Sequence, residues 1–312
     1  MRKSAIATLI LFLVFFASAA YALFVLSPQI VQEQVVEKFG ALGINVAALP
    51  APQKRYGALR YTDAALDTEG FSTIKTLDIV YDPLKLLMLK KLDSIKISGL
   101  SMTGEIAEDG ALSIAGWKNI PIPLSHERFE LNKIDIADAR LSLLTPFLGG
   151  ITLNYDLQIT KRKKNLELQG RINSEQKRLS LSAGISGHIN NKNLWQTNFN
   201  IEQGRIELAD IKASRVISNI QISNNNGAEP KLFAEFTAGG ISMHNLPWQN
   251  ASGSIEGTPF NYKILIDAKS TGAEGVELSL NAEKALNRPA ALMGNLHAEN
   301  AAALVKYLQN QK

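Results

Sequence analysis

The sequence contains no cysteine among its 312 residues. This excludes disulfide bonds, thiolate metal sites and cysteine nucleophiles, and it suits an oxidising compartment, where a stray thiol would be a liability. Aromatic residues are also scarce, at 7%, and they are not interleaved with a basic stripe as nucleic-acid binding would favour. Because 33 basic and 29 acidic residues nearly balance, we expect no nucleic-acid partner.

Catalytic and metal-binding motifs are missing as well. The sequence has no G-x-S-x-G elbow, phosphate loop, H-E-x-x-H or dinucleotide-binding signature. No histidine has a second histidine or a carboxylate at metal-ligand spacing; the four are His126, His188, His244 and His297. We therefore expect no enzyme, no catalytic residues, no metal site and no cofactor.

Long apolar runs are absent except for one near the N-terminus, Ala5 to Leu26. As a helix with a rise of about 1.5 Å per residue it covers about 33 Å, enough for a hydrocarbon core of about 30 Å. Arg2 and Lys3 precede the run, and no further basic residue follows until Lys38. The positive-inside rule then leaves residues 1–4 as a cytoplasmic stub and exports the rest. The sequence predicts a single-pass membrane protein with a transmembrane anchor at 5–26.

A cleaved signal peptide is the competing interpretation of the same run. Ile6 to Phe16 would be its apolar segment, and Ala17-Ser18-Ala19 or Ala20-Tyr21-Ala22 its small-residue cleavage site. Cleavage would leave the apolar segment Leu23 to Leu26 at the new terminus, which favours the uncleaved anchor. Both interpretations export the body of the chain.

Residues 27–49 are expected to form a short helix and a linker. Ser27-Pro28 has the order of an N-cap followed by proline at the first helical position. Val31, Val35 and Phe39 recur at four-residue spacing, and Gly40 provides a stop. The helix would continue from the membrane span towards the next part of the chain.

The body, residues 50–298, alternates apolar and polar residues with a period of two, as in Ile151, Leu153, Tyr155, Leu157 and Ile159. Such segments recur about every 10 to 13 residues, which leaves no room for crossover helices and predicts an antiparallel meander. We expect about 16 to 18 strands. The exceptions are the polar-faced segment Pro83 to Lys91, a short helix or turn, and a C-terminal helix within 299–312, where helix-forming residues predominate.

The fold class is therefore mainly β: a membrane helix, an antiparallel sheet and a short C-terminal helix. So long an apolar face can close on itself, as in a sandwich, or curl into an elongated trough that leaves its lining open to a ligand. If it is a trough, the expected lining residues are those that alternate on the apolar face: Ile95, Ile97, Leu153, Tyr155, Leu157, Leu168, Leu181, Leu208, Ile222, Ile264 and Leu278.

The densest run of charge falls between two expected strands and comprises Lys161, Arg162, Lys163 and Lys164. A solvated hairpin turn is the simpler interpretation. Contact with anionic lipid headgroups or a membrane surface is the alternative. The tryptophans Trp117, Trp195 and Trp248 are expected to pack at strand ends, with a position at a lipid rim as the other possibility.

Three stretches of the sequence resemble the AsmA-like superfamily of bacterial envelope proteins, in particular its YdbH-like, dicarboxylate-transport-domain branch. The first is the apolar run followed by Ser27-Pro28 and a helix. The second is Tyr81-Asp82-Pro83-Leu84 with Leu92 to Leu100 and Thr103-Gly104-Glu105. The third is Ala139 to Leu143, with Gly149 shortly after. The likeness covers about half of the chain and rests on patterned apolar residues.

The resemblance implies a bacterial inner-membrane anchor and a periplasmic β trough that shields acyl chains during lipid transport through the cell envelope. Its partners would be phospholipids or other acyl lipids, the inner membrane and other envelope proteins. At about 4.8 Å per strand, 16 strands extend about 77 Å, so a shuttle or a subunit is expected rather than a complete conduit. The alternative function is a non-enzymatic scaffold or assembly factor for secretion or outer-membrane biogenesis.

Overall fold

The structure is a computed structural model. It describes residues 26–33, 50–67, 69–89, 91–107, 112–115, 131–145, 149–163, 165–190, 194–208, 211–224, 230–243, 246–258, 261–270, 276–284 and 291–298. None of the helices within these ranges has the length and apolar character needed to cross a membrane. The expected anchor at 5–26 lies outside the described residues apart from Leu26, and the expected C-terminal helix lies wholly outside them.

The chain is mainly β, as predicted. The strands are β1 (Gln53–Arg55), β2 (Ala58–Ala65), β3 (Thr73–Val80), β4 (Ser94–Ile106), β5 (Leu112–Ile114), β6 (Lys133–Thr145), β7 (Gly149–Lys161), β8 (Asn165–Glu175), β9 (Leu179–Asn190), β10 (Trp195–Leu208), β11 (Ile211–Asn224), β12 (Lys231–Met243), β13 (Leu246–Gly257), β14 (Tyr262–Ser270), β15 (Val276–Lys284) and β16 (Ala291–Ala298). Residues 27–33 are helical, and α3 (Pro83–Leu89) joins β3 to β4.

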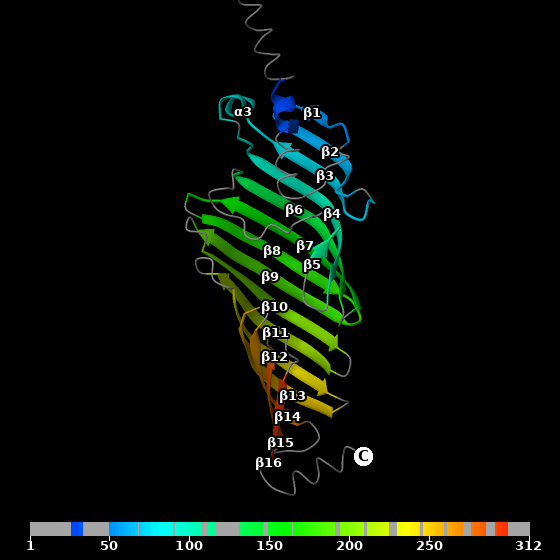
Figure 1. Ribbon diagram of the computed structural model, residues 1–312, viewed down its shortest axis with the longest axis vertical. Coiled ribbons are helices and arrows are strands. Elements are labelled where there is room, and N and C mark those ends of the chain that lie inside the picture. Colours follow the sequence, from blue (N-terminus) through cyan, green and yellow to red (C-terminus); the bar gives the residue numbers. More distant parts are fainter. Residues whose placement is uncertain are drawn as a thin grey trace, which may run out of the picture. The chain divides into compact units, whose positions relative to one another are not determined.

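All of these strands belong to one 16-stranded sheet. Their order in the sheet is the order in the chain, except that β5 lies off this path and pairs with β4 (Figure 1). The pairs whose register is described are antiparallel, from β1–β2 to β15–β16. The prediction of an antiparallel meander with about 16 strands is confirmed.

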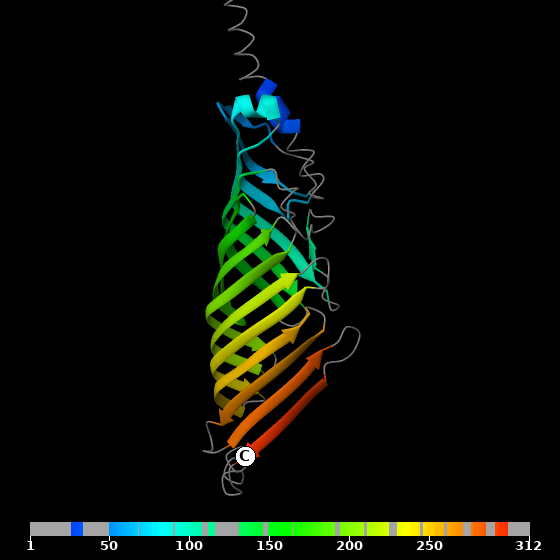
Figure 2. The same cartoon turned by 90° about the vertical axis from the view of Figure 1, so that its left-hand side faces the viewer.

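Two compact units divide the chain. Unit 1 comprises Met1–Gly104, Ser113–Leu124 and Arg128–Ala139, and unit 2 comprises Glu105–Leu112, Ser125–Glu127 and Arg140–Lys312. Unit 1 contains β1 to β3 and α3, and unit 2 contains β7 to β16, which Figure 2 shows as a succession of oblique neighbouring strands.

Unit 1 has a sealed core. Leu59, Leu77 and Ile79 on β2 and β3 are at most 1% exposed, and Val31 from the helix at 27–33 is fully buried with them. The same helix is tied to the sheet by a hydrogen bond between the side chains of Gln32 and Tyr61. The expected helix after Ser27-Pro28 is therefore confirmed over its described residues, and side-chain hydrogen bonds attach it to Tyr61 and Tyr81.

Residues with a left-handed backbone interrupt the alternation at matching positions on neighbouring strands. In unit 2, Arg215 and Asn250 have φ angles of 53° and 50°. They flank Gly239 on β12, since Val216 pairs with Ala238 and Ala238 with Ala251. The register shifts at Arg215 against β10 and at Asn250 against β14, and such β-bulges bend the strand and shift the alternation by one residue. The apolar face therefore continues across the bend, with Ala213 and Val216 both packed into it.

Candidate functional site

The candidate site is the apolar face of unit 2, called the inner face below. Residues directly opposite each other in a sheet lie on the same face, so the strand register defines one row that crosses β7 to β16. The row contains only apolar residues and one glycine: Leu157, Gly170, Ile185, Phe199, Ile220, Ala234, Ile255, Ile264, Ala282 and Leu292.

The next row along the strands lies on the opposite face and is mainly polar. Its members are Gln158, Gln169, Ser186, Asn198, Gln221, Phe233, Glu256, Lys263, Glu283 and Ala291. The contrast between these two adjacent rows shows an apolar side and a polar side that continue from β7 to β16, as the two-residue alternation predicted.

The predicted lining residues divide between the two units. Ile95 and Ile97 are on β4 in unit 1, and both are partly buried. Leu153, Tyr155, Leu157, Leu168, Leu181, Leu208, Ile222, Ile264 and Leu278 are on strands of unit 2. Apart from Leu208, whose side chain lies outside the description, these unit 2 residues are also partly buried, neither exposed nor sealed. Within unit 2 the described residues form strands and turns, so no described helix or second sheet covers them.

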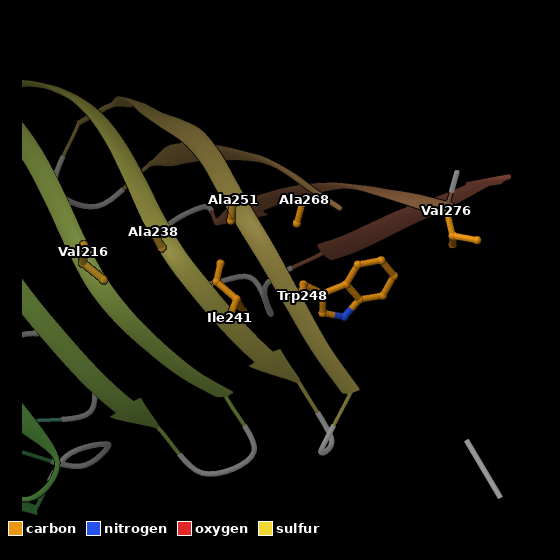
Figure 3. Close-up of a cluster of buried hydrophobic side chains, with 7 residues drawn as sticks. All are labelled: Val216, Ala238, Ile241, Trp248, Ala251, Ala268 and Val276. Carbon is orange, nitrogen blue, oxygen red and sulfur yellow. The ribbon is translucent and has the colours of Figure 1, made fainter. Parts of the chain in front are cut away.

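One margin of the inner face is closely packed. A cluster of buried side chains runs from β11 to β15 and is drawn in Figure 3: Val216, Ala238, Ile241, Trp248, Ala251, Ala268 and Val276. A smaller cluster joins Leu143, Ile151 and Leu179. Both clusters lie towards the turns that follow β6, β8, β10, β12 and β14. We call this side the packed margin. Trp248 packs near a strand end, as expected.

Burial on the inner face changes the chemistry of Tyr155. Burial raises the pKa of its hydroxyl from 10 to about 12, because a charged phenolate is disfavoured where water is excluded. Tyr155 lies opposite Ile172 and one inner-face position from Leu157. The surroundings of the Tyr155 hydroxyl thus favour its neutral form.

The opposite margin carries polar atoms among the apolar residues. Trp195 begins β10, at a strand end as predicted, and lies directly opposite Asn224. Trp195 Nε1 and Asn224 Oδ1 are both buried without a hydrogen-bond partner. A buried polar group left unsatisfied costs about 1 to 3 kcal/mol. A donor and an acceptor therefore sit side by side on the inner face with unused hydrogen-bonding capacity.

The basic run is a turn at this same margin. Lys161 ends β7, and the N–H of Arg162 donates to the carbonyl of Asn165 over 2.7 Å, which closes the hairpin to β8. The Arg162 guanidinium also lies 3.2 Å from Glu167, and Lys163 is exposed. Lys164 lies outside the described residues. The hairpin-turn interpretation is confirmed for the described part; contact with headgroups stays a prediction.

Metal-ligating clusters do not appear among the described residues. No group of three or more His, Asp or Glu side chains with metal-binding geometry occurs there. His188 and His297 are exposed on the outer face, paired across strands with Glu167 and Glu277, while His126, His244 and Trp117 lie outside the described ranges.

In comparisons with known proteins, no family model, no curated protein and no solved structure matches the chain.

Proposed function

We propose that unit 2 shields the acyl chains of phospholipids or other acyl lipids on its inner face. The observation that carries the proposal is the apolar row across β7 to β16, whose side chains are largely only partly buried and have no second layer over them in the described structure. A sandwich would have sealed such a face. In this proposal the sheet forms an elongated trough, and the chain is a non-enzymatic protein for lipid transport.

The energetic reason is the hydrophobic effect. Each methylene group removed from water contributes about 0.8 kcal/mol, so an acyl chain leaves a membrane at a useful rate only when a protein surface replaces its apolar surroundings. The partly buried side chains of the inner face gain further burial when such a chain covers them. The raised pKa of Tyr155 supports a water-poor surface at this place.

The two margins would have different roles. The packed margin is closed by its own side chains, so acyl tails would lie towards it. Trp195 Nε1 and Asn224 Oδ1 offer a donor and an acceptor at the opposite margin, which matches the ester and hydroxyl groups of a lipid. The basic turn at Lys161 to Lys163 lies on that same side and would attract an anionic headgroup.

The location belongs to the same proposal. The apolar run at 5–26 would anchor the chain in a bacterial inner membrane by a single pass, with the N-terminus in the cytoplasm and the body in the periplasm. The resemblance to AsmA-like proteins supports this location and a role in the cell envelope. Other envelope proteins would receive or deliver the lipid.

A scaffold or assembly factor is the second candidate. The strand order ends at β16, which pairs with β15, and a sheet edge can bind a partner by adding a strand. This candidate requires no lipid, so lipid binding separates it from the first.

A matched pair of substitutions tests the proposal. Leu157 lies on the inner face and Gln158, its neighbour, on the outer face. We expect Leu157→Lys to lower the amount of acyl lipid that purifies with the full chain, because a charge on the lining must be desolvated. Gln158→Lys should leave that amount unchanged. Lipid mass spectrometry of the purified chains measures the bound acyl lipid. A lipid-free wild-type chain would favour the scaffold.

A further inference from the structure

The short helix α3 in unit 1 presents an apolar surface outward. Leu84, Met88 and Leu89 are 62%, 81% and 58% exposed, while Leu86 is fully buried. The sequence pattern predicted a polar outer face for this segment, and that prediction is wrong. Three large apolar side chains exposed on seven residues are a patch and not the scattered apolar surface that every protein has.

This patch lies beside the end of the apolar N-terminal run, because Tyr81, which directly precedes Asp82 and α3, contacts the residue that follows the run. The side chains of Tyr81 and Ser27 share a hydrogen bond, and Ser27 directly follows that run, which ends at Leu26. The N–H of Tyr81 also donates to the carbonyl of Gly57 over 2.9 Å. The turn that carries Tyr56, which is exposed, is therefore at the same end of unit 1, as Figures 1 and 2 show for β1, α3 and the helix at 27–33.

The charged residues on α3 and β1 are all basic. Lys85 on α3 and Lys91, which follows the helix, are both exposed. Lys54 and Arg55 on β1 are exposed as well. The segment from Pro83 to Lys91 contains no acidic residue. Asp82 serves the helix itself: its Oδ1 accepts a hydrogen bond from the N–H of Leu84 over 2.9 Å, as an N-cap does, and it lies 3.8 Å from the Lys85 ammonium.

From these three observations we propose that α3 and the adjoining turn at Tyr56 form a membrane-docking face, which rests on the headgroup layer of an anionic bilayer. Leu84, Met88 and Leu89 enter the boundary between headgroups and acyl chains, Tyr56 lies at the level where tyrosine is enriched, and the lysines meet the lipid phosphates. The face would hold unit 1 against the membrane that the N-terminal run spans, and in this respect it rests on the anchor of the proposed function. It involves no residue of the lipid-shielding face of unit 2.

Phe71 provides a matched control because it is 57% exposed, about as much as Leu84 and Leu89, but lies at the other end of β2 and β3. The turn at 66–72 is separated from the turn at 56–57 by the whole length of β2, about 23 Å at roughly 3.3 Å per residue. That distance exceeds the depth of about 5 to 10 Å to which an interfacial helix is buried. Phe71 should therefore stay outside the lipid.

The absence of cysteine allows each position to be labelled alone. The full chain is prepared as Met88→Cys, Leu84→Cys or Phe71→Cys, labelled with bimane and reconstituted in phosphatidylglycerol nanodiscs, some of which carry brominated acyl chains. We expect a blue-shifted emission and bromine quenching at positions 84 and 88, and neither at position 71. Lys91→Glu in the Met88→Cys chain should reduce the quenching, as should phosphatidylcholine in place of phosphatidylglycerol.

Emission at position 88 that is as water-like as at position 71 would overturn the docking face, and so would a chain that does not associate with the nanodiscs. Equal quenching in the two lipids would overturn the role of the lysines. Lipid binding by unit 2 is measured on other residues, by the Leu157 and Gln158 pair, so the two proposals can fail separately.

Discussion

At the scale of single residues, unit 1 contains a well-defined ion pair on its polar face. Asp78 accepts hydrogen bonds from Arg60 Nε over 2.6 Å and from Arg60 Nη2 over 2.8 Å. These bonds are the main cause of a lowered pKa of the Asp78 carboxyl, with burial acting in the opposite direction and the charges of Arg60, Arg55 and Lys96 helping to lower it. The two residues lie directly opposite each other on β2 and β3.

This pair predicts a pH dependence of stability. Because the pKa of Asp78 is lower in the folded chain, the pair's contribution is complete above the unfolded pKa of about 3.9 and is lost as the pH falls through the folded pKa. We expect Asp78→Asn to destabilise unit 1 by about 1 kcal/mol or less at neutral pH, since the pair is partly exposed. The difference in unfolding free energy between the wild type and Asp78→Asn should shrink below about pH 4.

Urea denaturation at neutral and acidic pH measures this deficit. Arg60→Lys is the control: it keeps a positive charge but loses the two-point contact with the carboxylate, so it should retain part of the stability and of its pH dependence. A deficit for Asp78→Asn that stays constant down to pH 3 would rule out the pair as its cause.

At the scale of the strands, glycines on the two faces have different environments. Gly170 lies opposite Leu157 on the inner face, where an added Cβ would collide with the Asp156 carbonyl and lie 3.0 Å from Leu157 Cδ1. Gly184 on β9 lies on the outer face opposite Arg171, and an added Cβ there would meet nothing within 4 Å. The inner face is thus fitted closely around its glycines.

These environments predict opposite effects of the same substitution. Gly170→Ala should destabilise unit 2 by about 1 to 3 kcal/mol, because the backbone of β7 or β8 must move. Gly184→Ala should be neutral or stabilise by up to about 1 kcal/mol, since alanine restricts the unfolded chain. Thermal unfolding of both chains measures the difference. Equal effects would mean that the faces are not distinguished by packing.

The strands could be predicted from sequence where large apolar residues alternate. β7 is the clearest case, from Ile151 to Ile159, and β8 to β11, β14 and β15 follow in the same way. β12 and β13 give a weaker signal, because their inner positions carry small residues such as Ala234, Ala238 and Gly253. The left-handed residues Arg215 and Asn250 further shift the alternation. Asparagine adopts this conformation more readily than most residues, but the side chain of Arg215 gives no such signal.

The candidate site could be predicted in part. The alternation assigns residues such as Leu157 and Leu181 to the correct face, because a period of two fixes the face. It does not fix how deeply each is buried, since burial depends on the bends of the strands and on which margin is packed. The unpartnered atoms of Trp195 and Asn224 depend on the register of β10 against β11, which the sequence pattern does not specify.

At the scale of the whole molecule, the two units deal with their apolar faces differently. Unit 1 buries Leu59, Leu77 and Ile79 almost completely, with Val31 among them, whereas the inner face of unit 2 is mostly only partly buried. In the proposed function this difference would separate two roles, since unit 1 would dock on a membrane and the inner face of unit 2 would hold acyl chains.

The most direct measurement of the central claim compares two adjacent positions on β9. Leu181 lies on the inner face, where it packs against the cluster of Leu143, Ile151 and Leu179, and Ser182 is exposed on the outer face. A benzophenone amino acid is introduced at either position of the full chain, and the products of irradiation in membranes are identified by mass spectrometry. Acyl-lipid adducts at position 181 and none at position 182 are the predicted result. Lipid adducts at neither position, or equally at both, would contradict the claim that the inner face holds acyl chains.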